Sequence, residues 1–538
     1  MPDHPSPRPI RFFHRGAVRE VNDAAPTRSV LDWLREDAHC TGTKEGCNEG
    51  DCGACTAVIG ELAAPGDAAA VRGLSLKTVN ACIQFLPTLD GKALFSVEDL
   101  KGMGAGGLHP VGADELHPVG DGGLHPVQRA MVECHGSQCG FCTPGFVMSL
   151  WSLYEHHPAG AARPSRQQIA DELSGNLCRC TGYRPILDAG QRMFELPVLK
   201  LDTAPVIAAL TRLKAAGPLH YRAGGNSADP YHAPTTLAEL ATLREQLPRA
   251  LLLAGSTDVG LWVNKQFRAL GEIIHLGAVD ELKHVAEQDG ELRIGAGVSL
   301  EAAWAALAQR LPALTDVWLR FGSKPIRNAG TMGGNVANGS PIGDSAPVLM
   351  ALDAQLELRR GTRVRRLPLA AFYLGYMSNA LEPGEFVQGL AVPLAAAARQ
   401  VRAYKISKRF DCDISAVCAG LAIELDGATV KSVRLAFGGM AATVARAARA
   451  EAELVGRPWD PAGVERAKAA LAQDFQPLTD MRASAAYRLQ VARNLLQRFW
   501  LETRAEHPLP GSATSVFSVM PHVTEASGAA TNPVRTPR

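Results

Sequence analysis

Cysteine is the residue type in this chain that most clearly points to chemistry, and the chain contains twelve cysteines. Three follow the spacing C-x4-C-x2-C in "CNEGDCGACT", and a fourth follows in "VNACI". This first cysteine group is Cys47, Cys52, Cys55 and Cys82. The spacing is that of plant-type [2Fe–2S] sites, where one loop supplies three thiolates and another segment supplies the fourth. A structural zinc site is the main alternative, although zinc favours paired knuckles, and a disulfide framework ranks lower still.

A second cysteine group combines C-x2-C in "SQCGFCTPGFVMSLW" with C-x-C in "GNLCRCTGYRPI". Its members are Cys139, Cys142, Cys178 and Cys180. Pro144 and Gly145 fit the first turn of a helix after the first pair, and C-x-C lies between two more helical patterns. Four thiolates at helix ends suit a second cluster in a small helical bundle, with zinc again the alternative. The remaining cysteines are interpreted as small hydrophobic residues; they are Cys40, Cys134, Cys412 and Cys418.

The elements around the first group must bring its loop and its distant fourth cysteine together. Gly46, Gly50 and Gly53 allow positive φ angles and a close approach of the backbone to sulfur. Before them, "AVREVNDA" predicts a β-hairpin and "SVLDWLRED" a short amphipathic helix. These patterns are consistent with a small β-grasp, ferredoxin-like domain.

Two glycine-rich segments could bind the phosphates of a cofactor. "RALLLAGSTDVGLWVNKQ" predicts a buried strand, a turn over 255–260 and a helix, whose first N–H groups can hold phosphate oxygens. "GTMGGNVANGSPIGDSAPVLMAL" leads into a helix that we expect Asp344 or Ser345 to cap. Each loop alone is a weak signal, because most glycine clusters are turns. No G-x-G-x-x-G follows a predicted strand, so a Rossmann nicotinamide site is not indicated.

Composition limits the classes of function. The 538 residues, 46% hydrophobic and 20% charged, predict a globular chain of about three to four domains. A formal net charge of +1 is too small to attract nucleic acid or an anionic membrane surface, so we expect neither as a partner. The sequence shows no secretory h-region and no long apolar run, so we expect a cytoplasmic protein with reduced thiols. No Ser–His–Asp set or carboxylate pair indicates acid–base catalysis in this chain, and we interpret His135 as a packed histidine.

The two cysteine groups together resemble a known family. "CNEGDCGACT" with "NAC", then "QCGFCTPGFVMS" and "GNLCRCTGYRPI", resemble the iron–sulfur half of the molybdenum hydroxylases, the xanthine dehydrogenase and aldehyde oxidase family. The match covers nearly all of residues 9–195. It implies that the second group's cluster lies next to a molybdopterin, with Gln138 and Cys180 facing it. It also implies that the first group's cluster lies nearer a flavin.

The two glycine-rich loops resemble the FAD domain of the same family in order and spacing. The resemblance implies that the first loop holds the FAD diphosphate and ribityl portion, and that the second does so from the opposite side. The first-loop residues are Leu253, Ala254, Gly255, Ser256, Thr257, Asp258, Val259 and Gly260, and the second-loop residues are Thr331, Gly333, Gly334 and Asn335. Phe321 would lie against the isoalloxazine, Asp344 would hydrogen-bond the cofactor, and Lys405 would reach it from the next domain. From the residues alone, a core aromatic and a helix cap are the better interpretations of Phe321 and Asp344.

The patterns and the resemblance together predict an α+β multidomain protein. We expect a β-grasp [2Fe–2S] ferredoxin-like domain (9–100), a linker (101–124), a four-helix-bundle [2Fe–2S] domain (125–196) and a second linker (197–228). An α+β FAD-binding domain of the PCMH type (229–397), an α+β C-terminal domain like that of CO dehydrogenase flavoproteins (398–505) and a disordered tail (506–538) follow. In the C-terminal domain, "AVCAGLAIELDG" and "TVKSVRLAFGG" predict strands, and "YRLQVARNLLQRFW" a helix.

The first linker contains a short repeat, because "LHPV" occurs at Leu108, Leu116 and Leu124. A histidine-containing tract can bind metal. A short tandem repeat is more often an enlarged loop, since lengthening a loop costs little closure entropy. We therefore expect this segment to be dispensable for the clusters.

The resemblance implies an electron relay rather than a site of bond-making. Within the family, both clusters and FAD in one chain resemble the small subunits of bacterial members whose molybdopterin lies on a large subunit. The implied reaction is hydroxylation of xanthine or hypoxanthine at that partner, with electrons passing through both clusters to FAD and on to NAD+. A dimer of heterodimers is the implied assembly. The alternatives are a relay for an aldehyde or N-heterocycle hydroxylase and a stand-alone flavin and iron–sulfur protein.

Overall fold

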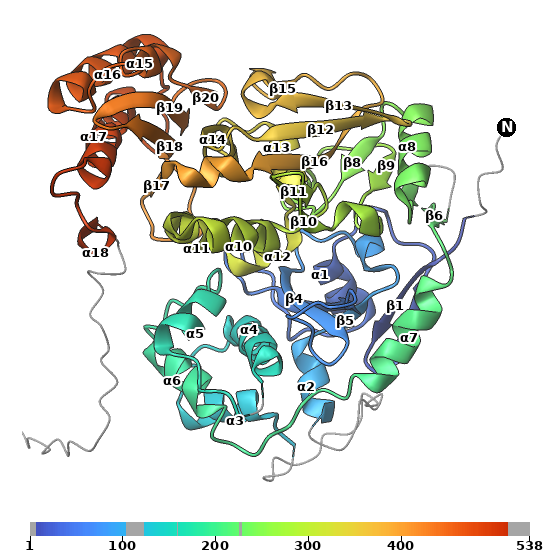
Figure 1. Cartoon of the computed structure of the whole chain (residues 1–538). Helices are drawn as coiled ribbons and strands as arrows, with labels where there is room; N and C mark the ends of the chain where they lie inside the picture. The colour runs from blue at the N-terminus through green and yellow to red at the C-terminus, as the bar shows by residue number, and fades with distance from the viewer. Residues whose placement is uncertain (1–6, 104–122, 159, 225–228, 515–538) are drawn as a thin grey trace, which may run out of the picture.

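The computed structural model describes residues 7–103, 123–158, 160–224 and 229–514, which form four units in chain order (Figure 1). An N-terminal sheet is followed by a helical bundle, by a unit built on two sheets and by a C-terminal sheet with helices. The predicted α+β multidomain architecture is confirmed. Within the described residues, no helix has the length and apolar character needed to cross a bilayer.

The N-terminal unit is a five-stranded mixed sheet in the order β2-β1-β5-β3-β4. β1 pairs antiparallel with β2 and parallel with β5, as expected of a β-grasp. Trp33 packs edge-on against Phe12, with ring centroids 4.8 Å apart, and so joins the helical segment to the sheet. The strands are β1 (Ile10–His14), β2 (Ala17–Val21), β3 (Thr56–Leu62), β4 (Leu74–Asn80) and β5 (Ala93–Phe95), and the helices are α1 (Val30–Asp32), continued by a π-helical turn (Trp33–Asp37), and α2 (Val97–Met103).

The prediction of a hairpin within "AVREVNDA" is wrong. Residues 17–21 form only β2, and the hairpin turn lies earlier, at Arg15 and Gly16 between β1 and β2. Both turn residues have positive φ, 50° and 74°, as tight hairpin turns require. Arginine is uncommon in that conformation, so the sequence does not mark the turn. The helix predicted in "SVLDWLRED" is confirmed.

The second unit is a bundle of four helices, as predicted. Phe146 and Trp151 of α4 are completely buried in its core. Pro144 lies in the first turn of α4, where it was predicted. The backbone of Gly190 approaches α5 so closely that a Cβ would lie 2.7 Å from Ile169. The helices are α3 (Pro126–Glu133), α4 (Thr143–His156), α5 (Arg166–Glu172) and α6 (Arg184–Arg192).

The third copy of the repeat begins this bundle. His125 Nδ1 accepts the N–H of Val127 at 3.2 Å, and the Gln128 side chain accepts the N–H of His125, which completes a capping box for α3. Burial lowers the pKa of His125 to about 4, so the ring is neutral and able to accept. The copies at Leu108 and Leu116 lie outside the described residues.

The third unit contains two main sheets, of four and five strands, and a two-stranded pair formed by β14 and β15. In the smaller one, ordered β6-β7-β9-β8, strand β9 pairs in parallel with β7 and β8. The larger one, ordered β10-β11-β16-β12-β13, is antiparallel, and its core includes Trp304 and Phe372. The strands are β6 (Leu219–Tyr221), β7 (Tyr231–Ala233), β8 (Leu251–Leu253), β9 (Ile273–His275), β10 (Val285–Gln288), β11 (Glu291–Gly295), β12 (Gln355–Arg360), β13 (Arg363–Pro368), β14 (Tyr373–Gly375), β15 (Ser378–Asn379) and β16 (Phe386–Pro393). The helices are α7 (Ala204–Lys214), α8 (Leu237–Gln246), α9 (Val259–Asn264), α10 (Leu300–Arg310), α11 (Thr315–Leu319), α12 (Lys324–Ala329), α13 (Met332–Asn338) and α14 (Ser345–Ala351).

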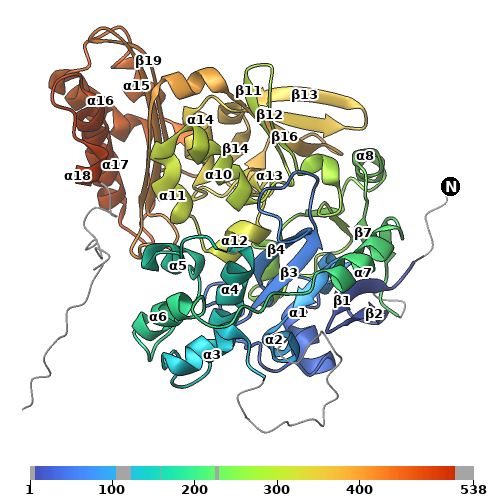
Figure 2. The ribbon, with the colours of Figure 1, turned by 60° about the horizontal axis from the view of Figure 1, so that its bottom comes forward.

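The C-terminal unit is an antiparallel sheet in the order β17-β18-β19-β20 with helices packed on it (Figure 2). The two strands and the long helix predicted here are confirmed. A Cβ on Gly420 would lie 2.4 Å from the Pro347 carbonyl, so the sheet meets the third unit in backbone contact. Of the predicted tail, residues 511–514 form a helix and the remainder from 515 lies outside the described residues. The elements are β17 (Gln400–Ile406), β18 (Val417–Asp426), β19 (Thr429–Gly438), β20 (Ala445–Arg446), α15 (Ala448–Ala452), α16 (Pro461–Asp474), α17 (Ala485–Thr503) and α18 (Gly511–Thr514).

Candidate redox cofactor sites

The four thiols of the first cysteine group lie in two pairs. Cys55 Sγ and Cys82 Sγ are 3.3 Å apart. Cys47 Sγ accepts the backbone N–H groups of Asp51 and Cys52, both at 3.3 Å, and the Cys47 N–H points at Cys52 Sγ at 3.4 Å. A two-iron cluster held by four cysteines takes two thiolates on each iron, so this division fits the predicted [2Fe–2S] site.

The loop glycines have the two functions predicted for them. Gly50 and Gly53 have φ of +78° and +69°, where a residue with a Cβ is strained. Gly46 allows close approach, because a Cβ there would lie 2.7 Å from Cys52 Sγ. Backbone N–H groups therefore reach the sulfurs without obstruction.

Hydrogen bonds to sulfur favour the ionised thiol in each pair. The bond with Cys52 lowers the pKa of Cys47 to about 5, and the bond with Cys82 lowers the pKa of Cys55. The pKa of each partner thiol is raised by the same bond. Since the thiolate is the form that binds metal, each pair already contains one favoured ligand.

The second cysteine group gathers between the starts of two helices. Cys142 directly precedes α4, and Cys178 and Cys180 lie shortly before α6. Cys180 Sγ lies 3.8 Å from both Cys178 Sγ and Cys139 Sγ. Cys178 Sγ is also 3.0 Å from the hydroxyl of Thr181. Among the described residues, no three Cys, His, Asp or Glu side chains are arranged to hold a single metal ion.

The pKa of Cys178 is set by opposing effects. Burial alone would raise it, but hydrogen bonds from Thr181, from the Cys180 N–H and from the Cys142 thiol together outweigh burial and lower this pKa to about 7. Burial and the neighbouring Cys178 raise the pKa of Cys142 to about 12. The second group thus also contains one thiol that ionises near neutral pH.

Exposure distinguishes the residues around the second group. Cys139 and Cys180 are exposed, as is Gln138. The interpretation of His135 as a packed histidine is wrong: its ring is exposed, and the residue has φ of +54° just after α3 ends. Cys40 and Cys418 are buried as interpreted, whereas Cys134 and Cys412 are partly exposed.

The two cysteine groups are joined by direct hydrogen bonds. The N–H of Leu177, next to Cys178, donates to Cys52 O at 3.0 Å. The Asn176 side chain donates to Gly53 O at 3.1 Å. A Cβ on Gly53 would lie 2.3 Å from the Gly175 carbonyl, so the two loops are in backbone contact. Asn176 was missed by sequence reasoning, although it stands in "GNLCRC" beside the second group.

The first glycine-rich loop turns sharply between β8 and α9. Ser256 has φ of +64°, and its buried hydroxyl has no hydrogen-bond partner among the described residues. A Cβ on Gly255 would lie 1.9 Å from the Ala329 carbonyl, and one on Gly260 would collide with Ile83. An unpartnered buried hydroxyl in such a turn fits the polar portion of FAD. Leu253 is buried, whereas Ala254, Thr257 and Val259 are partly exposed.

The second glycine-rich loop comes against the first. Thr331 Oγ1 accepts the N–H of Gly334 at 3.0 Å and caps α13. Asp258 of the first loop accepts a hydrogen bond from Asn338, at the end of α13, at 3.2 Å. Gly333 leaves no room for a side chain, and Asn335 is half-buried in the first turn. The two loops therefore lie together, as the resemblance implies.

Asp344 is held by the C-terminal unit. Lys405 Nζ lies 2.6 Å from Asp344 Oδ2, and Ser415 Oγ donates to Asp344 Oδ1 at 2.6 Å. All three side chains are buried. Asp344 occupies the N-cap position of α14, as expected, but its side chain makes no capping hydrogen bond because Lys405 and Ser415 engage its carboxylate. Phe321 packs against Trp304 in the core, with ring centroids 5.8 Å apart.

Helix α9 connects the first glycine-rich loop with the first cysteine group. In the loop that precedes it, Gly255 O accepts a hydrogen bond from the Gln84 side chain at 2.9 Å. At its end, Asn264 donates to Cys82 O at 2.8 Å. The order of contact is therefore second cysteine group, first cysteine group, glycine-rich loop. Sequence reasoning missed Gln84 and Asn264, because their partners lie more than 150 residues away in the chain.

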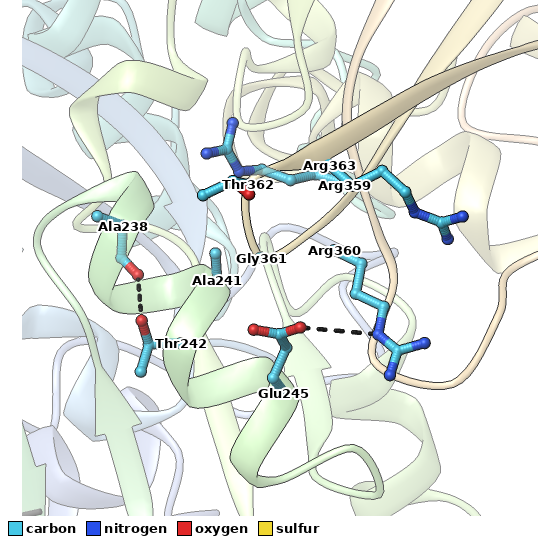
Figure 3. Close-up of a pocket in the computed structure, with 9 residues that line it drawn as sticks. All are labelled: Ala238, Ala241, Thr242, Glu245, Arg359, Arg360, Gly361, Thr362 and Arg363. Atoms are coloured by element: carbon cyan, nitrogen blue, oxygen red, sulfur yellow. Dashed lines mark hydrogen bonds and ion pairs between the residues drawn. The ribbon is translucent and has the colours of Figure 1, made fainter.

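A cavity of about 560 Å³ lies elsewhere, between α8 and the turn joining β12 to β13 (Figure 3). Both Glu245 and Arg360 line it, and Figure 3 shows the Glu245 carboxylate directed at Arg360, with an ion-pair distance of 3.7 Å. None of the residues expected to bind a cofactor lines this cavity. This cavity is therefore separate from the candidate redox sites.

Four family models match the chain in the order of its units. The "2Fe-2S iron-sulfur cluster binding domain" matches residues 12–85, and the "[2Fe-2S] binding domain" matches 114–191. The "FAD binding domain in molybdopterin dehydrogenase" matches 223–395, and the "CO dehydrogenase flavoprotein C-terminal domain" matches 402–503. These matches define an electron-transferring iron–sulfur flavoprotein with two [2Fe–2S] domains and an FAD-binding domain.

Known proteins give the family. The chain is 32% identical to xanthine dehydrogenase of Emericella nidulans over 553 residues, covering 91% of this chain and 38% of that protein. It is 28% identical to aldehyde oxidase 4 of Cavia porcellus over 515 residues, covering 86% and 36%. A solved carbon monoxide dehydrogenase from Hydrogenophaga pseudoflava is 28% identical with a TM-score of 0.47, covering 50% of this chain and 94% of that one. The chain belongs to the molybdenum hydroxylase family, and it spans less than two fifths of the length of these curated relatives.

Proposed function

We propose that this chain is the iron–sulfur and FAD subunit of a xanthine dehydrogenase. In this proposal a molybdopterin partner hydroxylates xanthine or hypoxanthine, and electrons pass through the second cysteine group, the first cysteine group and FAD to NAD+. The observation that carries it is the unbroken series of contacts from Leu177 beside Cys178, through Cys52 and Cys82, to the loop at Gly255. The likeness to a xanthine dehydrogenase over 91% of the chain supports the substrate class.

Hydrogen-bond donors of the chain stabilise negatively charged sulfur at both cysteine groups. Backbone N–H groups point at Cys47 Sγ, and the Thr181 hydroxyl lies against Cys178 Sγ. When bound, each cluster carries one electron at a time, and FAD can take two and pass on a hydride. Ser256 would bind the polar portion of FAD through its buried hydroxyl, which has no hydrogen-bond partner in the described part of the chain. The Asp344–Lys405 pair would present a buried, oriented carboxylate to the cofactor.

The molybdopterin partner would cover the second cysteine group. Cys139 and Cys180 are exposed there, and the exposed rings of Phe141 and Tyr183 lie in the same two segments. Exposed apolar side chains that gather around a functional site are typical of a surface covered by another protein. A dimer of heterodimers in the cytoplasm is the assembly and location that the resemblance favours.

A second candidate is a relay for an aldehyde or N-heterocycle hydroxylase, which the likeness to aldehyde oxidase 4 favours. The chain's own residues do not select between these substrates, because the proposed oxidation takes place on the partner. A stand-alone flavin and iron–sulfur protein is distinguished by purification, since it would carry both clusters without molybdenum.

An anaerobic experiment on the native complex tests the proposal. Xanthine should bleach the flavin and iron–sulfur absorbance, and NAD+ should restore it. Bleaching by dithionite but not by xanthine would support the cofactor assignment and contradict the purine substrate. Aldehydes and N-heterocycles would then be tried next. A colourless protein that binds zinc would contradict the cluster assignment itself.

A further inference from the structure

The end of helix α9 makes a second contact with the first cysteine group. Lys265, the residue after the helix, donates from Nζ to Cys47 O at 2.6 Å. Asn264 donates to Cys82 O at 2.8 Å and to Asn48 Oδ1 at 3.1 Å. The two neighbouring side chains therefore bind the backbone of both halves of the site, the loop and the distant fourth cysteine.

The loop that holds the first three cysteines carries two carboxylates, and each faces a cation from a different unit. Lys265 Nζ lies 3.8 Å from Glu49 Oε2. Arg409, from the C-terminal unit, lies 3.7 Å from Asp51 Oδ2. Both ion pairs are half-exposed, so their own contribution to stability is small. The shorter hydrogen bond to Cys47 O, rather than the pair with Glu49, fixes where the Lys265 charge lies.

We propose that Lys265 is a positioning residue that sets the reduction potential of the first cysteine group's cluster. The inference rests on the cysteine ligands proposed above. A reduced [2Fe–2S] cluster carries one more negative charge than the oxidised one, so a nearby fixed cation favours reduction. Glu49 opposes this effect. Lys265 directly follows α9, the helix that comes after the first glycine-rich loop. Its hydrogen bond to Cys47 O therefore also holds the loop of the first cysteine group against the third unit.

Redox titration of the purified native complex, followed by low-temperature electron paramagnetic resonance, tests this. The signal of the first cluster is assigned by its loss in Cys47→Ser. Lys265→Met should lower the equilibrium constant for reducing that cluster by about tenfold, ~59 mV for a one-electron couple. Lys265→Arg keeps the charge and should restore most of the potential. Glu49→Gln should shift the potential in the opposite direction.

The matched control is Lys431→Met. Lys431 is also an exposed lysine paired with a glutamate, Glu424, at 2.6 Å, but it lies on β19, outside both cysteine groups. It should leave both potentials unchanged. The second cluster's potential provides an internal control in every variant.

Three outcomes are decisive. An unchanged first-cluster potential in Lys265→Met, with the signal intact, would overturn the inference. If Lys265→Met loses the cluster, Glu49→Gln decides, because a potential that does not rise in that variant also overturns it. Absence of any iron–sulfur signal in the unaltered protein would instead contradict the proposed function. Failure of the proposed function is therefore distinguishable from failure of the inference about Lys265.

Discussion

The two cysteine groups each consist of four thiols but differ in how far their most accessible and most buried members are exposed. Cys55 and Cys82 of the first group are buried, and residues from three other units contact its loop: Leu177, Lys265 and Arg409. Cys139 and Cys180 of the second group are exposed. A buried site enclosed by its own chain suits an internal step of electron transfer, whereas an exposed one suits exchange with another molecule. The contrast assigns each group its place in the proposed relay.

The largest expected effect comes from removing one thiolate of either group. Cys47→Ser and Cys178→Ser should each lower the iron content from about four to about two atoms per chain, since each [2Fe–2S] cluster contains two irons. Each variant should lose one of two paramagnetic signals, keep FAD and slow transfer to NAD+. Iron analysis and spectroscopy of the same samples check this. Full iron and full turnover in both variants would show that the ligands are wrong.

A pair of glycine variants sharpens the contrast in burial. Gly53 and Gly140 both have positive φ, +69° and +83°. A Cβ on Gly53 would lie 2.3 Å from a backbone oxygen, whereas one on Gly140 would meet no atom of the described residues within 4 Å. Gly53→Ala should therefore cost about 3 kcal/mol of stability, from strain plus overpacking. Gly140→Ala should cost only about 1 kcal/mol, from strain alone. Thermal unfolding of the holoproteins compares the two, and equal losses would contradict the packing described here.

Thiol accessibility provides a smaller but direct comparison. After iron is removed under mild conditions, iodoacetamide should modify Cys139 and Cys180 at least about tenfold faster than Cys55 and Cys82, because alkylation needs an accessible thiolate. The rate at Cys178 should rise around pH 7, as its lowered pKa implies. Peptide mass spectrometry measures each rate. Equal rates at all sites would show that the first group is not enclosed when iron is absent.

The smallest effect is expected from shortening the segment between the two sites. Deletion of residues 108–123 should leave the iron content and turnover near those of the unaltered protein, because most of the repeat is interpreted as an enlarged loop. The third copy must be kept from Leu124 onward, since His125 caps α3. Loss of the second cluster alone in this deletion would show that the segment supports the bundle.

Local patterns in the sequence predicted much of this structure. Cysteine spacing predicted both groups, and glycine in the loop around Cys47 predicted positive φ and close approach, because these features depend on neighbours in the chain. The start of α4 at Pro144 and the strands β18 and β19 followed from equally local signals.

The missed features depend on contacts between distant segments. Lys405 and Ser415 engage Asp344 across the junction of two units, so its carboxylate does not cap α14. Asn264 and Lys265 contact cysteines more than 180 residues away. His135 is a local exception: it follows the C-cap of α3 with φ of +54°, a turn that its own sequence does not mark, and its ring is exposed. None of these outcomes follows from spacing or periodicity.

Helix α9 also constrains how the chain length can vary. It has six residues and is therefore about 9 Å long, at roughly 1.5 Å of rise for each residue. One inserted residue would advance its end by about 1.5 Å and rotate it by about 100°, turning Asn264 and Lys265 away from the cysteine loop. Insertions and deletions between Gly255 and Lys265 should therefore break these contacts, whereas we expect the segment before Leu124 to tolerate changes in length. In the course of evolution, this short helix would keep its residue count even where its side chains change.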